Sequence, residues 1–424
     1  MKIHGIIYFS LILLASFLST QVAFSQSLSD YLQTAAEKNP SLKASYQQYF
    51  SALERVPQVG ALPDPQLTFG YFVSPVETRV GPQRARFSVQ QMLPWFGTRD
   101  ARRDAATQEA QLRFEEFVQA RNDLFFEVKK AYFQLNNLQQ DIVLTRENIE
   151  IMQSYERLAT QKYENDLASM VDILRVQMQL RDERNKLITL QEQLAAQGVV
   201  FNNLLNRAED AEVDLPEEPE RPLILADTAN WRSQMLAENP AINILQAESE
   251  LLAERERLAG LSSKPQLGVG LDYAIVGQRN DMEIPDNGQD IIMPMVSLSI
   301  PLFNGRKYEA ARREVQIQRE ANVAATEARE NELISQLSLV AKDYQVARSQ
   351  VQLFEEQIDA TRQAIGILNS AYESTSQNFE DVLEFQQKLL QYQISLNEAL
   401  TQLQIAGAKI EQLRAVEVMD FDEK

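Results

Sequence analysis

Two stretches of this 424-residue chain share one pattern: "DPQLTFGYFV" at Asp64–Val73 and "KPQLGVGLDY" at Lys264–Tyr273. The letters Pro-Gln-Leu and a later glycine recur at an offset of 200 residues. In both stretches apolar residues alternate with polar or small ones, which is the period of a β-strand with one apolar face. Each stretch has about ten residues, the length that a tilted strand needs to cross a bilayer.

The repeated strand belongs to a longer internal duplication. Three other pairs of segments recur in the same order: Asn39–Pro40 with Asn239–Pro240, "LPWFGTR" (93–99) with "IPLFNGR" (300–306), and "YENDLASMVDILRVQ" (163–177) with "YESTSQNFEDVLEFQ" (372–386). Four landmarks in one order indicate two copies of a single structural unit. We therefore expect a first repeat over residues 26–207 and a second over residues 228–413, with a linker at 208–227 that is rich in proline and acid, and a short tail at 414–424.

Both repeats predict the same succession of elements. The order is a helical segment, two alternating strands around a polar loop, a very long helix, a turn and a return helix. The expected ranges are 28–57, 64–73, 84–93, 98–164 and 168–207 in the first repeat, and 228–261, 265–275, 291–300, 306–373 and 378–413 in the second.

The long helices carry apolar residues at heptad spacing, which is typical of coiled-coil packing. The first has Val128, Leu135, Ile142 and Ile149 in one seam, and the second has its own seam from Leu337 to Tyr372. At 1.5 Å per residue each long helix spans about 100 Å, and the two shorter helices of a repeat together span about the same. We expect the shorter helices to stack end to end beside the long one, in a helical cylinder.

Composition excludes several classes of protein. There is no cysteine, the only histidine is His4, and the formal net charge is -19. Residues 1–25 read as a signal peptide, because a short apolar run follows Lys2 and ends at small residues. The exported chain then lacks histidine and cysteine, so we expect no catalytic triad, no bound cofactor and no tight metal site. The acidic balance argues against nucleic acid as a partner. The chain has ten methionines, which in helices usually fill cores.

The fold class that follows is mainly α with a small β part. Four strands cannot close into a barrel, and open sheet edges in lipid leave backbone groups unpaired at several kcal/mol each. Two copies give eight strands, and side chains fill the interior of a barrel of that size. Three copies give twelve, so the sequence predicts that each chain contributes four strands to a trimeric transmembrane β-barrel that continues into a coiled-coil α-barrel.

The ordered set of duplicated motifs resembles the TolC-type outer-membrane efflux proteins. The residues that carry the resemblance are "AEKNP" and "AENP", "DPQL" and "KPQL", the junctions "LPWFGTR" and "IPLFNGR", and the paired turns after Tyr163 and Tyr372. The resemblance covers essentially the whole mature chain. It implies a homotrimeric channel in the outer membrane with a long periplasmic extension. It further implies docking to a periplasmic adaptor and an inner-membrane pump, with a resistance-nodulation-division pump favoured and an ABC pump possible.

The resemblance also suggests functional residues at the periplasmic end. Asp172, Asp381 and Glu384 match acidic positions that line the constriction of the family. Tyr163 and Tyr372 stand where a helix meets its turn, and Asn165, Asp166, Ser374 and Thr375 belong to the turns expected to dock the adaptor. The family commonly has glycine where this chain has Asp166 and Thr375; Asp tolerates left-handed backbone, and Thr disfavours it.

Two alternatives stay open at this stage. The three acidic residues could simply complement helix N-termini, where negative charge is favourable. The chain could also be a soluble periplasmic coiled-coil scaffold or adaptor, which would explain the heptads but not the four strands of membrane-spanning length.

Overall fold

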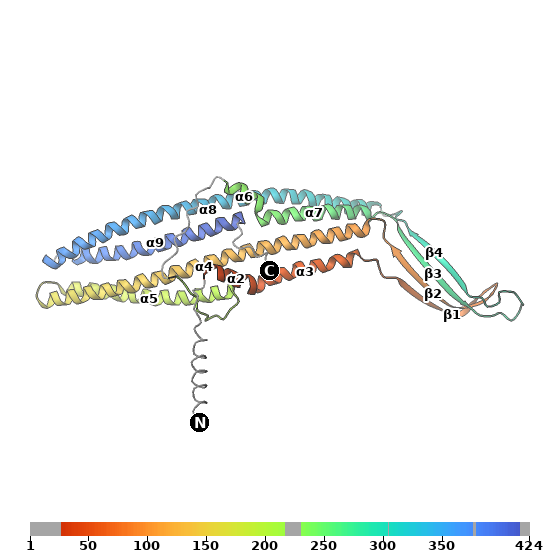
Figure 1. Ribbon diagram of the computed structural model, residues 1–424, viewed down its shortest axis with the longest axis horizontal. Coiled ribbons are helices and arrows are strands. Elements are labelled where there is room, and N and C mark those ends of the chain that lie inside the picture. The colour runs from red at the N-terminus through yellow and green to blue at the C-terminus, as the bar shows by residue number, and fades with distance from the viewer. Residues whose placement is uncertain (1–26, 217–229, 304, 376–378, 416–424) are drawn as a thin grey trace, which may run out of the picture. The chain divides into compact units, whose positions relative to one another are not determined.

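The computed structural model describes residues 27–216, 230–303, 305–375 and 379–415. The expected signal peptide, most of the expected linker and the end of the tail lie outside them. The elements follow the predicted order twice (Figure 1). The first half comprises α2 (Leu28–Lys38), α3 (Pro40–Gly60), β1 (Gln66–Thr78), β2 (Gly81–Leu93), α4 (Thr98–Glu164) and α5 (Met170–Leu204). The second comprises α6 (Trp231–Glu238), α7 (Pro240–Leu261), β3 (Gln266–Val276), β4 (Ile291–Ser299), α8 (Gly305–Thr375) and α9 (Phe379–Arg414).

The first helical segment of each half is split, which differs from the single helices expected at 28–57 and 228–261. The breaks fall at Asn39 and Asn239, whose backbones are extended (ψ 123° and 124°). Each asparagine precedes a proline, and proline disfavours the helical conformation for the residue before it. Proline is nevertheless well suited to the first position of the helix that follows.

The two asparagines also bind the ends of the return helices. Asn39 Nδ2 donates to the backbone oxygen of Leu204 at 2.9 Å, and Asn239 Nδ2 donates to that of Leu413 at 2.8 Å. The last carbonyls of a helix have no partner within it. The repeated Asn–Pro motif therefore breaks one helix and caps the end of another, in both halves.

The chain forms two compact units, and each draws segments from both halves of the sequence. Unit 1 takes the described parts of Met1–Asn39, Leu124–Ala226 and Val340–Ile410. Unit 2 takes those of Pro40–Asp123, Asp227–Leu339 and Glu411–Lys424. The long helices α4 and α8 contribute to both units.

Unit 1 is a helical assembly whose core follows the predicted heptads. Val128, Leu135 and Ile142 of α4 are at most 2% exposed, and Tyr344 and Tyr372 of α8 are 1% exposed. Toward the turns, residues of α4 and α5 pack with residues of α8 and α9 in one cluster that includes Met152, Val176 and Val382. Burial of the seam positions confirms the packing that the heptad pattern predicted.

A row of polar side chains interrupts the apolar seam between α4 and α9. Asn397 Nδ2 donates to Asp141 Oδ1 at 2.8 Å and to the backbone oxygen of Asn137 at 2.9 Å. Thr401 Oγ1 donates to Asn137 Oδ1 at 3.2 Å. Burial raises the pKa of Asp141 to about 6, although the hydrogen bond from Asn397 and the charge of Lys186 oppose the rise.

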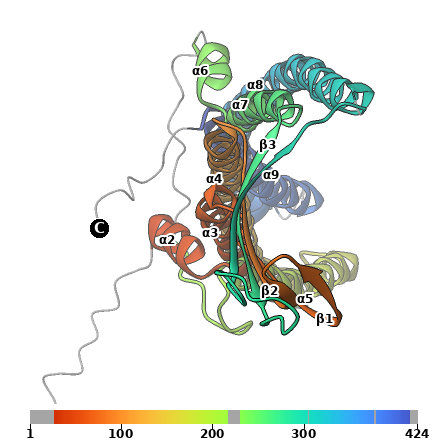
Figure 2. The same cartoon turned by 90° about the vertical axis from the view of Figure 1, so that its right-hand side faces the viewer.

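Unit 2 contains an antiparallel sheet of order β1-β2-β3-β4, whose strands lie side by side (Figure 2). The second hairpin matches its predicted strands closely. The first is longer than predicted, because residues 74–83, expected as a loop, mostly continue the strands. Thr78 pairs with Gly81, so that Arg79 and Val80 form the turn, and a register shift between Tyr71 and Val76 accommodates the polar segment.

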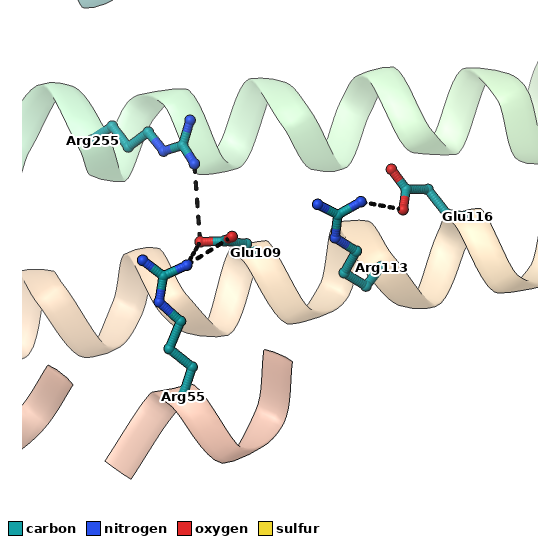
Figure 3. A network of polar contacts seen from close by, with 5 residues as sticks. All are labelled: Arg55, Glu109, Arg113, Glu116 and Arg255. Atoms are coloured by element: carbon teal, nitrogen blue, oxygen red, sulfur yellow. Dashed lines mark hydrogen bonds and ion pairs between the residues drawn. The ribbon is translucent and has the colours of Figure 1, made fainter. Parts of the chain in front are cut away.

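The helices of unit 2 are joined by ion pairs across α4 (Figure 3). Glu109 of α4 lies 3.0 Å from the guanidinium of Arg55 on α3 and 3.9 Å from that of Arg255 on α7. One carboxylate thus connects two neighbouring helices to α4. Exposed pairs of this kind each contribute at most about 1 kcal/mol, so they orient the helices more than they stabilise them.

In the part of the chain that the structure describes, no helix has the length and hydropathy needed to cross a membrane.

The buried carboxyl of Asp141 makes unit 1 sensitive to pH. Its pKa is raised in the folded state from an ordinary value of 3.8 to about 6. The contribution of this group to the free energy of unfolding is therefore fully present below pH 3.8 and is lost as the pH rises to about 6. We expect Asp141→Asn to remove this pH-dependent contribution of about 3 kcal/mol. Melting of the detergent-solubilised chain between about pH 4 and 7 should show a flatter profile for this variant.

Asp182→Asn, at an exposed position of α5, is the matched control for the Asp141 variant. The control should keep the wild-type slope. An Asp141→Asn profile parallel to that of the wild type would show that Asp141 does not titrate in this range.

Candidate functional site: the helix turns and the two faces of the sheet

The turn between α4 and α5 ends in a left-handed residue. The Leu167 amide donates to the Lys162 oxygen at 2.9 Å, the Asp166 amide donates to the Tyr163 oxygen at 3.0 Å, and Asp166 has a φ of 59°. This pair of bonds is a Schellman motif, in which glycine usually takes the left-handed position. Asp166 replaces that glycine as expected, since aspartate adopts left-handed backbone more readily than most residues. The turn is therefore regular without a glycine.

Asp172 begins α5 as part of a capping box. The Ser169 amide donates to Asp172 Oδ2 at 3.1 Å, and Ser169 Oγ accepts from the Val171 amide at 3.1 Å. These bonds satisfy backbone donors that the first turn of a helix leaves free. The capping interpretation of Asp172 thus has direct structural support, and its position in a constriction stays a prediction.

The second turn is described only at its borders. Helix α8 ends at Thr375 and α9 begins at Phe379, so the shape expected for the intervening turn lies outside the described residues. Ser374 Oγ donates back to the Ser370 oxygen at 3.0 Å and completes the last turn of α8. Asp381 lies in the first turn of α9. Glu384, one turn later, forms an exposed ion pair with Lys388 at 2.6 Å.

Tyr163 and Tyr372, which correspond in the duplication, have opposite environments. Tyr163 is 45% exposed, whereas Tyr372 is 1% exposed. The Tyr372 ring stacks on Phe379 at a centroid distance of 4.6 Å. Burial, with a smaller effect of the Asp172 charge, raises the pKa of the Tyr372 hydroxyl to about 12. That hydroxyl has no hydrogen-bond partner within the described ranges, so the tyrosine acts here as a buried aromatic ring.

Lys162 links the two helical hairpins at this end of unit 1. Its Nζ donates to the backbone oxygen of Tyr372 at 2.6 Å and to that of Glu373 at 3.4 Å, and it lies 4.4 Å from the centroid of the Tyr372 ring. A cation is favourable at a helix C-terminus and over an aromatic face. The sequence did not indicate a role for this residue, because a lysine in the last turn of α4 would ordinarily interact with the C-terminal carbonyl groups of α4 itself.

A second, more exposed link joins the same hairpins. Arg175 of α5 forms an ion pair with Glu380 of α9 at 2.8 Å, and the two side chains are 42% and 69% exposed. Such a pair is weaker than the Lys162 contact, because solvent screens it.

The sheet of unit 2 has one face without charge. Alternation along the strands puts every second residue on the same side, and the register aligns Leu67 with Val89, Val89 with Leu271, and Leu271 with Pro294. The exposed large apolar residues of this face are Leu67, Phe69, Tyr71, Phe87, Val89, Leu267, Val269, Leu271, Tyr273, Ile292, Val296 and Leu298. All of them are at least 37% exposed. An uncharged apolar face of this extent fits contact with lipid.

The opposite face of the sheet is mixed and carries charge. Arg86 of β2 forms an ion pair with Asp272 of β3, and Gln90 Nε2 donates to Ser297 Oγ on β4 at 2.9 Å. Thr68, Ser88 and Ser299 belong to the same face by alternation. The contrast between the two faces fits a sheet with lipid on one side and an aqueous space on the other.

The loop between β3 and β4 is fixed to the turn of the first hairpin. The Gly277 amide donates to the Pro82 oxygen and the Gly288 amide donates to the Val80 oxygen, both at 2.7 Å. Arg79 forms an ion pair with Asp286 at 3.4 Å. The two hairpins are therefore joined beyond the strands as well as along β2 and β3.

The contacts of Lys162 predict a local effect of its removal. Lys162→Met should raise the hydrogen-exchange rate at the end of α8, because two carbonyls lose their donor at a cost of about 1–2 kcal/mol. Lys162→Arg should retain most of the protection, and Arg157→Met, an exposed position on the same helix, should not change it. Unaltered exchange in Lys162→Met would mean that the contact contributes nothing to the order of this end.

Comparison with known structures supports this fold. The outer membrane protein VceC of Vibrio cholerae matches with a TM-score of 0.72 and 16% identity over 91% of this chain and 95% of that one. The MtrE outer membrane channel of Neisseria gonorrhoeae, solved in an open state, matches with a TM-score of 0.73 and 14% identity over 91% and 88%. A membrane protein of Pseudomonas aeruginosa gives a TM-score of 0.75 and 18% identity over 91% and 90%. No curated protein matched the sequence.

The sequence itself decides the family. Residues 31–207 and 231–415 match the sequence profile of the family described as "Outer membrane efflux protein". The two matched segments cover nearly the whole chain and correspond to the two halves seen in the structure. The chain belongs to the outer membrane efflux protein family.

Proposed function

We propose that three copies of this outer-membrane protein form one channel through which substrates leave the cell envelope passively. The observation that carries the proposal is the open sheet. Among the described residues β1 and β4 are the edge strands of a four-strand sheet. If the uncharged face contacts lipid, the unpaired backbone groups of these two edges lie in lipid as well. Pairing β1 of one copy with β4 of the next removes every edge. Twelve strands are the first multiple of four that leaves a lumen.

Exposed apolar stripes on unit 1 support assembly of the helices as well. Val346, Leu353 and Ile367 of α8 are 48%, 48% and 72% exposed and lie at multiples of seven residues from one another. Val171, Leu174 and Met178 form a similar stripe near the start of α5, with 53%, 48% and 65% exposure. Seam residues left in solvent favour packing against helices of neighbouring copies.

The partners in this proposal are a periplasmic adaptor and an inner-membrane pump. A pump of the resistance-nodulation-division type is favoured, and an ABC pump is possible. The adaptor would dock at the turns that contain Asn165, Asp166, Ser374 and Thr375. Energy would come from the pump, and the chain itself would carry out no chemical step.

The proposed constriction involves Asp172, Asp381 and Glu384. All three lie in the first two turns of α5 or α9, next to the turns that would meet the adaptor. Three copies would bring nine carboxyl groups together, and a group of this kind attracts cations. Capping and gating are compatible, because a carboxylate that binds backbone amides still projects its charge into the surroundings.

The soluble-scaffold alternative is not favoured. A soluble protein rarely exposes so large an uncharged face, and the family is one of outer-membrane proteins.

The proposal predicts a detergent-soluble trimer that conducts ions. The full chain should fractionate with outer membranes, and the purified complex should have three times the mass of the mature chain. It should also conduct when added to a planar bilayer. A water-soluble monomer or dimer without conductance would refute the channel and revive the scaffold.

Neutralising the three acidic residues of the proposed constriction should change the ion selectivity of the channel. We expect the triple variant Asp172→Asn, Asp381→Asn and Glu384→Gln to shift the reversal potential in a KCl gradient toward lower cation preference. Amides are chosen because the side-chain oxygen of an asparagine at residue 172 can still accept from the Ser169 amide, as the third residue of a capping box does. Asp182→Asn, Asp359→Asn and Glu356→Gln, three exposed positions, form the control. Equal reversal potentials for the two variants would exclude the three carboxylates from the constriction.

A further inference from the structure

The connections between the strands and the helices of unit 2 all lie at one end of the sheet (Figure 1). Leu93, the last residue of β2, pairs with Leu267 of β3, which pairs in turn with Leu298 of β4. These three leucines form the last row of the uncharged face at that end. The residues that follow this row along the chain therefore border the apolar face.

The two connections that lead from the sheet into α4 and α8 expose aromatic side chains. Phe96 is 85% exposed and Phe303 is 95% exposed, and their neighbours Trp95 and Leu302 are 37% and 72% exposed. The two connections correspond to each other in the internal duplication. Aromatic residues of membrane proteins gather at the level of the lipid headgroups. The uncharged face thus ends in residues that suit the border of a bilayer.

Cations follow these aromatic residues directly. Residues 94–104 contain three arginines and two aspartates, and residues 300–313 contain three arginines, one lysine and a single glutamate. The chain as a whole has a formal net charge of -19. The excess of positive charge is therefore a local property of the strand-to-helix connections.

Several of these cations lack an anionic partner within the protein. Arg306 and Lys307 of α8, and Lys264 just before β3, are exposed and form no ion pair within the described ranges. Arg99, which matches Arg306 in the duplication, instead donates from Nε to the backbone oxygen of Gly60 at 2.9 Å. Arg306 thus stays in solvent where its counterpart fixes the end of α3.

The register of the sheet places Lys264 between the two aromatic connections. Leu267 pairs with Leu93, and Gln266 pairs with Ser299. Because these strands are antiparallel, Lys264 lies beside the residues that follow β2 and beside those that follow β4. Lys264, Arg306 and Lys307, here called the junction cations, therefore adjoin the exposed aromatic residues.

The chemistry of this surface selects a class of lipid. Arginine and lysine bind phosphate oxygens through charge-assisted hydrogen bonds. Each cation close to an anionic lipid surface strengthens binding about fivefold. An anionic phospholipid combines such a headgroup with acyl chains that suit the uncharged face, whereas a zwitterionic lipid offers no net charge to the cations.

We propose that the junction cations bind the phosphate groups of anionic glycerophospholipids, such as phosphatidylglycerol, in the leaflet that faces the periplasm. The inference rests on the proposed function, because it requires the uncharged face to contact lipid. It adds a preference for headgroup charge to a contact that apolar surface alone would leave unselective.

The competing explanation is contact between copies. In the proposed trimer β4 pairs with β1 of the next copy, so Leu302 and Phe303 would lie close to the end of helix α3 of that copy. This explanation does not account for Phe96, because β2 is an inner strand of the sheet. Contact with lipid explains the exposed aromatic residues of both connections.

The test measures lipid preference with the tryptophan that the junction already contains. The chain has two tryptophans; Trp95 lies in the first connection, and Trp231 of α6 is 3% exposed and gives a constant background. The full trimer is reconstituted in vesicles of phosphatidylcholine and phosphatidylglycerol, with bromine on the acyl chains of one lipid or the other. Bromine quenches tryptophan on contact, so the ratio of quenching gives the relative affinity of the two lipids beside Trp95.

Two variants that remove the same charge are compared with the wild type. The junction variant is Lys264→Gln, Arg306→Gln, Lys307→Gln. The control variant is Lys43→Gln, Lys342→Gln, Arg348→Gln, three exposed positions farther along α3 and α8. The control shows whether net charge alone determines the lipid preference.

We expect the wild type to prefer phosphatidylglycerol at least about fivefold at low salt. High salt should reduce this preference, because it screens exposed charges. The junction variant should lose most of the preference, and the control should keep it. A wild type without preference, or a junction variant with the preference of the wild type, would overturn the proposal. The wild-type measurement and its salt dependence need no variant to fold.

The mass of the complex in detergent identifies the competing explanation. Loss of the trimer in the junction variant, together with a wild type that shows no lipid preference, would assign the cations to contact between copies and overturn the lipid site.

Conductance in planar bilayers of phosphatidylcholine alone separates this inference from the proposed function. A trimer that conducts there and shows no preference for phosphatidylglycerol overturns the lipid site alone. A chain that forms no conducting trimer overturns the channel, whatever lipid it prefers.

Discussion

The backbone hydrogen bonds at the edges of the four-strand sheet are the constraint on which the rest of the structure depends. Water can satisfy an unpaired strand edge, and lipid cannot. The uncharged face formed by residues such as Leu67, Phe69 and Val296 fits lipid surroundings. In such surroundings β1 and β4 would need partners that the described chain does not supply. Duplication provides two hairpins, and the register of β2 with β3 joins them into one unit. Identical copies are the simplest source of the missing partners.

The helical part shows that equivalent residues in a duplicated chain need not keep equivalent roles. Asn39 and Asn239 do, because each caps the end of a return helix. Tyr163 and Tyr372 do not, since Lys162 reaches across from one hairpin and covers the tyrosine of the other. The two hairpins meet in an asymmetric contact, in which one ring is buried and its counterpart stays exposed.

How much the sequence predicts depends on how local the signal is. Period-two alternation located all four strands, and heptads identified the two long helices, because both patterns are properties of a short segment. The strands of the first hairpin were predicted too short. The polar segment around Glu77 resembles a loop in sequence, but pairing with β2 keeps it extended. The Asn–Pro motif was visible in the sequence. Its capping role could not be predicted, because the carbonyl group that each asparagine binds lies more than 160 residues away in the chain. The contacts of Lys162 and the position of Lys264 beside the start of α8 depend on register and tertiary contact, which no single segment contains.

The capping bonds of Asp172 have a consequence for how such an end can open. A carboxylate that binds the Ser169 amide stabilises the start of α5. Any movement that unwinds the first turn would break these bonds, whereas a movement of the whole helix would preserve them. The Schellman motif at Asp166 and the capping box at Ser169 close both ends of the turn. The bonds at both ends favour a turn that moves as a rigid element. In the proposed channel, opening would then require displacement of the hairpins against each other, at the contacts that Lys162 and Arg175 make.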